Sequence, residues 1–135
     1  MSTDKGHKKK LIYLMHVSWY WIRQRPHFLA IQLSEYFDTT ILYPKSLRHA
    51  NAESTAPENC KGIFQFPFSR FGIIKRLNRY LYRQTLKKHL KMADILWTGH
   101  PEDFSLIKDL IPASTKIIYD CMDDLCEFPG IKSTP

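Results

Sequence analysis

The chain has 135 residues, a length that allows one domain with a substantial core and is short for a two-domain enzyme. Hydrophobic residues make up 44% of it and aromatic residues 13%, which excludes a disordered chain, and no apolar run is long enough to predict a transmembrane helix. The formal net charge is +7, but eight Lys and Arg residues and no Asp or Glu lie between Arg70 and Lys91, so one segment carries the excess.

The start of the chain and the cysteines favour a cytoplasmic protein. Residues 1–8 are polar and rich in lysine, and we expect a disordered basic tail there, followed by a domain over 9–135. The apolar run that follows is too short for a secretory signal and lacks a small-residue cleavage site. The three cysteines form no CxxC pair and no even-numbered disulfide framework, so we expect a reducing compartment and cysteines that pack as small hydrophobic residues.

The first half of the chain predicts three strands and one helix. Segment 9–17 is nearly continuous in apolar residues, as in a strand that is buried on both faces. Segment 26–37 begins with a proline suited to a first helical turn, and its apolar residues recur at helical spacing. The β-branched segment 39–44 indicates a second strand. A polar loop over 45–61 then leads to a third strand over 62–68, near a sheet edge because it contains a proline.

The second half continues the alternation of strands and helices. We predict a basic helix over 71–91, a strand over 93–99, a short helix over 101–111 with two acids in its first turn, and a strand over 115–121. This pattern predicts an α/β fold, a Rossmann-like doubly wound parallel sheet of five strands in the order 3-2-1-4-5.

Ligands of such sheets bind outside the carboxyl ends of the strands, which directs attention to the segments 17–25, 98–101 and 120–124. The first of these contains no GxGxxG, so ordinary dinucleotide binding is disfavoured. It contains instead flat aromatic rings and arginine side chains near the start of a helix. These residues suit the apolar face of a sugar ring and a phosphate or carboxylate. We predict substrate contacts from Trp19, Trp21, Arg23 and Arg25; the alternative is that the aromatic rings pack beneath the sheet.

The other two segments contain candidate catalytic residues. His100, between a strand and a helix, is placed to act as a base or to hydrogen-bond a hydroxyl; the alternative is a solvent-facing histidine at the start of the helix. Asp120 suits sugar hydroxyls or a helix cap. Its spacing to Asp123 and Asp124 matches no specific metal-binding loop, so we predict no metal site. A phosphate-ester enzyme that uses Asp120 and Asp123 is a weaker alternative.

The basic segment predicts an amphipathic helix with an apolar side in its first half. Such a helix suits anionic lipid headgroups, and equally a nucleic-acid backbone. Nucleic acid is the less favoured partner, because an aromatic RNP motif and a GXXG loop are both missing. A solvated face is the third alternative, which the lack of acids disfavours. The residues predicted to contact the membrane are Lys75, Arg76, Arg79, Arg83, Lys87, Lys88 and Lys91.

Three stretches together resemble a known family. A Trp followed by Gln24, Arg25 and Pro26 and then by Leu-Ala, the TGHP segment, and the YDxxDD run at 119–124 are similar to the N-terminal domain of GT-B glycosyltransferases. The similarity extends over about 9–128 and is to family-4-like bacterial members that build envelope, capsular or teichuronic-acid-type polysaccharides. It implies substrate contacts from Gln24 and Asp123 as well.

The resemblance implies two Rossmann-like domains with the active site between them and no bound metal or other cofactor. The N-terminal domain would bind a saccharide or lipid-linked acceptor, and a second domain, absent from this chain, would bind the nucleotide sugar. We therefore expect an incomplete, acceptor-side half of an enzyme at the cytoplasmic membrane face, inactive by itself. The alternative is a non-catalytic module that binds membrane or RNA through residues 70–91.

Overall fold

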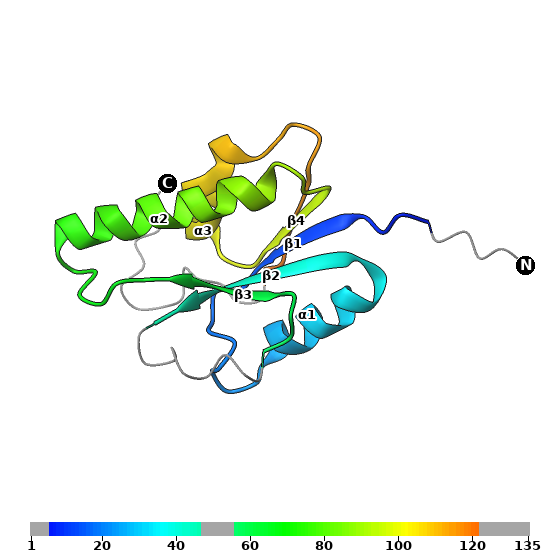
Figure 1. Ribbon diagram of the computed structural model, residues 1–135, viewed down its shortest axis with the longest axis horizontal. Coiled ribbons are helices and arrows are strands. Elements are labelled where there is room, and N and C mark those ends of the chain that lie inside the picture. Colours follow the sequence, from blue (N-terminus) through cyan, green and yellow to red (C-terminus); the bar gives the residue numbers. More distant parts are fainter. Residues whose placement is uncertain (1–5, 47–55, 122–135) are drawn as a thin grey trace, which may run out of the picture.

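The computed structural model describes residues 6–46 and 56–121 and contains one five-stranded sheet (Figure 1). All strands are parallel and lie in the order β3-β2-β1-β4-β5, which confirms the predicted topology. The strands are β1 (Lys10–Leu14), β2 (Asp38–Lys45), β3 (Cys60–Phe64), β4 (Ile95–Thr98) and β5 (Lys116–Tyr119).

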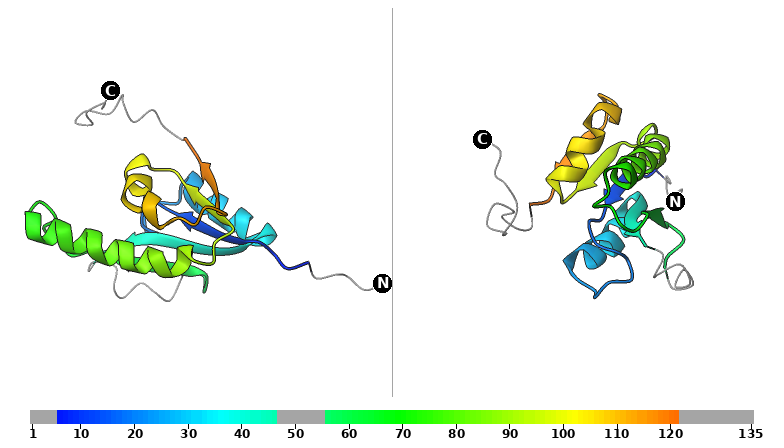
Figure 2. Two further views of the ribbon diagram at one scale, coloured as in Figure 1. Left: turned by 90° about the horizontal axis from the view of Figure 1, so that it is seen from above. Right: turned by 90° about the vertical axis from the view of Figure 1, so that its left-hand side faces the viewer.

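Helices cover the sheet on both faces, as expected of a doubly wound fold (Figures 1 and 2). One face is covered by α1 (Arg25–Tyr36), and the other by α2 (Gly72–Leu90) and α3 (Pro101–Ile107), which continues into a short 3-10 turn, η3 (Lys108–Leu110). Within the described ranges, no helix is long and apolar enough to cross a membrane.

The core consists of two layers that share the central strand β1. Leu11, Tyr13 and Met15 pack on the α1 side, whereas Ile12 and Leu14 pack on the side of α2 and α3. Both faces of β1 are therefore buried, which explains why its sequence is a nearly continuous apolar run.

Several element boundaries differ from the sequence-based expectations. The first strand ends at Leu14 rather than at residue 17, although the Met15 N–H still donates to the Leu42 carbonyl (2.9 Å). The third strand begins at Cys60, because residues that looked like loop pair with β2. The expected tail over 1–8 lies mostly outside the described residues; at its end, the Lys8 ammonium donates to the Glu35 carbonyl (2.9 Å).

Candidate functional site

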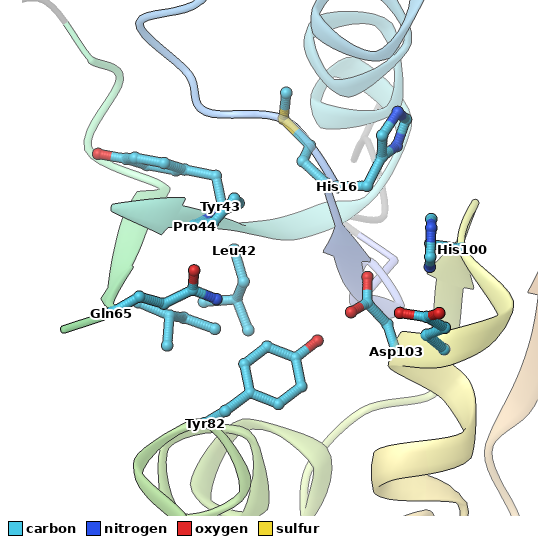
Figure 3. Close-up of a pocket in the computed structure, with 11 residues that line it drawn as sticks. His16, Leu42, Tyr43, Pro44, Gln65, Tyr82, His100 and Asp103 are labelled. Atoms are coloured by element: carbon cyan, nitrogen blue, oxygen red, sulfur yellow. The ribbon is translucent and has the colours of Figure 1, made fainter. Parts of the chain in front are cut away.

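A cavity of about 250 Å³ lies at the carboxyl edge of the sheet, where strands β1 to β4 end (Figure 3). Its walls also include α2 and the first turn of α3. Tyr43, Pro44 and Leu42 provide apolar surface. The polar side chains of the wall are His16, Gln65, Tyr82, His100, Glu102 and Asp103. Apolar walls with a few convergent polar groups are typical of a small-molecule site.

The two histidines meet because their strands are neighbours. In the register of the sheet Leu14 pairs with Thr98, so His16 and His100 each lie two residues beyond a paired position. Their ring centroids are 6.2 Å apart with an interplanar angle of 31°. His100 is also the residue that precedes the first turn of α3, so the helix start holds its backbone in place.

Asp103 and Tyr82 form the lower part of the cavity (Figure 3). Burial raises the pKa of Asp103, while the charge of His100 and the hydrogen bond from Tyr82 oppose that rise. Burial also raises the pKa of Tyr82, and the negative charge of Asp103 and their hydrogen bond raise it further. A carboxyl group with a raised pKa beside an imidazole is suited to exchange a proton with a substrate hydroxyl.

A second polar contact lies at the same edge but is not part of the cavity wall. The Arg25 guanidinium pairs with the Asp120 carboxylate (3.0 Å), joining the first turn of α1 to the end of β5. The arginine is largely exposed and the aspartate largely buried, and among the described residues Asp120 Oδ2 has no hydrogen-bond partner. Arg25 and Asp120, two of the predicted site residues, are thus brought together. Neither of them belongs to the wall of the cavity that contains His100.

Trp19 differs from the prediction. It is 7% exposed and belongs to the core on the α1 side, where its ring lies 5.2 Å from the His27 ring. A buried ring offers no free face to a sugar, so the stacking role predicted for Trp19 is wrong. Trp21 is 56% exposed, and Arg23 and Gln24 are exposed beside it, so these three remain accessible to a ligand.

His27 is the residue that sequence reasoning overlooked in this loop. Its Nδ1 accepts a hydrogen bond from the Gln24 N–H (3.2 Å), so the ring proton lies on Nε2, which donates to the Trp19 carbonyl (3.1 Å). The buried imidazole therefore ties the loop to the first turn of α1. A histidine directly after the proline of a first helical turn was the available signal, because that position can reach back to the helix start.

The predicted membrane-contacting residues divide into two groups. Six of them are exposed on α2 or directly after it: Lys75, Arg76, Arg79, Lys87, Lys88 and Lys91. Arg83 instead forms a two-pronged ion pair with Asp109 (2.7 and 2.8 Å) and donates to the Leu106 carbonyl (2.6 Å). This arginine fastens α2 to the end of α3, and its contact with a membrane stays a prediction.

The remaining predictions concern Asp123 and metal ions. Asp123 lies outside the described residues. Within residues 6–46 and 56–121, no group of three His, Cys, Asp or Glu side chains is placed to hold a metal ion.

Comparisons with protein-family models, curated proteins and solved structures found no match for this chain.

Proposed function

We propose that the chain is the acceptor-binding part of a nucleotide-sugar-dependent glycosyltransferase, and that the acceptor saccharide occupies the cavity at the carboxyl edge. The observation that carries the proposal is the convergence of His16, His100 and Asp103 in a cavity with tyrosine and proline walls. Sugars present hydroxyls to polar groups and C–H faces to flat apolar ones, and both kinds of surface are present. At about 250 Å³ the cavity is smaller than most pockets for drug-sized ligands, which favours a single sugar unit.

The proposed chemistry uses the cavity residues as a proton acceptor. An acceptor hydroxyl attacks the anomeric carbon of the donor, the bond from that carbon to the phosphate oxygen breaks, and the nucleotide diphosphate leaves. The hydroxyl proton passes to His100 or Asp103, which act as the general base. The other cavity groups position the acceptor, and this positioning supplies the rest of the rate acceleration.

The donor side of the proposal rests on the family resemblance. A nucleotide sugar would be bound by a second domain, and Arg23 and Arg25 would attract phosphate at the start of α1. A phosphate there would compete with Asp120 for the Arg25 guanidinium. The acceptor class that we propose is a saccharide or lipid-linked saccharide of cell-envelope polysaccharide or glycolipid synthesis, at the cytoplasmic face of the membrane.

The test is glycosyl transfer by the natural full-length polypeptide that contains this chain. We expect His100→Gln and Asp103→Asn to lower kcat by about 10²-fold or more, because each removes a proton acceptor. Ser105→Ala is the matched control, since Ser105 is exposed on the same helix and outside the cavity wall. Unchanged kcat/KM in both cavity variants would refute the proposal.

A non-catalytic binding module is the second candidate. It is favoured by one observation, the exposure of six basic side chains on and directly after α2, in a segment whose own sequence contains no acidic residue. A polypeptide that binds membranes or RNA through this helix but transfers no sugar would support this candidate over the first.

A further inference from the structure

The charge of the cavity at the carboxyl edge is opposite to that of the chain. The chain has 20 Lys and Arg residues against 13 Asp and Glu, and a net charge of +7. Among the described residues, no Lys or Arg lines the cavity. Its acidic wall residues are Glu102 and Asp103, beside the two histidines His16 and His100. A ligand in the cavity therefore meets carboxylates within a positively charged protein.

These two carboxylates are not committed to ion pairs within the protein. In the described part of the chain, the ion pairs join Arg25 to Asp120 and Arg83 to Asp109, and neither Glu102 nor Asp103 pairs with a Lys or Arg. A largely buried carboxylate that lacks a cation is unfavourable, because burial removes water that would otherwise solvate the charge. A ligand that brings its own positive charge would remove this cost.

The start of α3 does not account for the two acids. Carboxylates in a first helical turn ordinarily interact with the positive end of the helix, which lowers their pKa. The pKa of Asp103 is raised instead, because burial dominates and the negative charge of Glu102 adds to it. The charge of His100 and the hydrogen bond from Tyr82 oppose this rise without cancelling it. The demand for a further cation therefore remains.

The cavity places these carboxylates across from an apolar wall. Asp103 lies between Tyr82 and His100 and is turned towards the cavity, whereas Tyr43 and Pro44 lie on the opposite side (Figure 3). A sugar ring that packs on Tyr43 and Pro44 would direct polar substituents to the other side. One substituent would face the carboxylates, and another would face His100.

We infer that the cavity selects a saccharide with a free, protonated amine, whose ammonium group is bound by Asp103 and Glu102 while a hydroxyl faces His100. The inference rests on the proposed function, since it names the class of acceptor that the same cavity takes. Ammonium-to-carboxylate hydrogen bonds are charge-assisted and stronger than neutral ones. An N-acetylated amine has no charge and loses this contribution.

The test is isothermal titration calorimetry of the chain at pH 7 with three methyl glycosides that differ at one position. Methyl glucosaminide has the ammonium group, methyl N-acetylglucosaminide has a neutral amide, and methyl glucoside has a hydroxyl. We expect the Kd of the glucosaminide to be at least about tenfold lower than that of either neutral glycoside, because hydrogen bonds to charged groups are the strong ones.

Two variants and a matched control assign the preference to the wall. Glu102→Gln should reduce the preference for the amine at least about threefold and leave the Kd of methyl glucoside unchanged, since only a charge is removed from an exposed side chain. Asp103→Asn should abolish the preference. Glu35→Gln removes the same charge from an exposed position on α1, outside the cavity, and should keep the preference of the parent chain. Circular dichroism would verify that each variant is folded.

Cyclohexylamine separates a sugar amine from any other amine, because it has the ammonium group and no hydroxyl. Weaker binding of cyclohexylamine than of the glucosaminide would support the inference. Equal binding of the two would overturn it, because the cavity would then select amines rather than sugars.

Two further results would overturn the inference and differ in what they say of the proposed function. If all three glycosides bound equally, or if the preference survived both cavity variants, the amine would not be recognised and saccharide binding would stand. If no glycoside bound, saccharide binding by the cavity would fail together with the inference.

Discussion

The carboxyl edge of the sheet has one side next to α1 and another next to α2 and α3. The two sides differ in whether the residues that stand out in the sequence are the ones that line a cavity. On the α1 side, Trp19 packs in the core and Arg25 pairs with Asp120, whereas Trp21 between them is exposed. On the α2 and α3 side, inconspicuous residues such as His16, Tyr82 and Asp103 surround an open cavity. Unusual composition in a loop can therefore serve packing, whereas a binding site can arise from ordinary residues that the topology brings together.

The largest change in stability is expected for a tryptophan on the α1 side, if that side serves packing. Trp19→Ala should lower the free energy of unfolding by about 3–5 kcal/mol, because it removes a large buried ring and leaves a cavity. Trp21→Ala should change it by less than about 0.5 kcal/mol, since an exposed ring packs on little. Urea denaturation of both variants measures the difference, and equal losses would show that the two rings are equivalent.

The second prediction concerns the histidine that joins loop and helix. His27→Ala should cost about 2–3 kcal/mol of stability, because the Gln24 N–H and the Trp19 carbonyl lose their partners. His100→Gln, on the opposite side of the edge, should cost less than about 0.5 kcal/mol. A His27→Ala variant as stable as the parent chain would contradict the structural role.

The third prediction tests whether the cavity side is built for function at the expense of stability. Burial raises the folded-state pKa of Asp103, so the fold favours the protonated carboxyl group. The stability that this group contributes is complete at low pH and is lost as pH rises through that pKa. Asp103→Asn should therefore raise the melting temperature at pH 7 and have little effect at pH 4. Thermal unfolding at the two pH values measures this. A lower melting temperature at pH 7 would show that the ionised carboxylate stabilises the fold.

The smallest expected effect lies at the exposed ion pair between α2 and η3. The hydrogen bond from Arg83 lowers the pKa of Asp109 to about 2, so the contribution of the pair is present above the ordinary carboxyl range and is lost as pH falls towards 2. Arg83→Gln should lower the melting temperature slightly at pH 6 and not at pH 2. A pH-independent effect would show that packing, rather than the ion pair, is responsible.

Much of the fold is predictable because its signals are local. The apolar run of β1, the prolines in the first turns of α1 and α3, and the alternation of strands and helices each depend on neighbouring residues. The handedness rule then favours the observed strand order. The predicted ends of the strands were less accurate. Cys60, for example, belongs to β3 because it pairs with β2, and no local pattern reveals this pairing.

The candidate site was only partly predictable. His100 was found because it follows a strand at the edge where ligands bind. Asp103 and Tyr82 were missed because they meet through packing of α3 against α2, two helices whose relative placement depends on the whole sheet. Trp19 and Trp21 could not be distinguished, because a turn has no periodicity that assigns one ring to the core and the other to solvent.

Whether the cavity binds a saccharide can be measured by nuclear magnetic resonance of the histidine side chains. Methyl glycosides of glucose and N-acetylglucosamine would be titrated into the chain with the imidazole signals assigned. We predict saturable shifts for His16 and His100, no shift for His27 or His89, and weaker binding in Asp103→Asn. If none of these glycosides shifted His16 or His100, or if a Gln65→Trp change that fills the cavity left the shifts intact, the account would be contradicted.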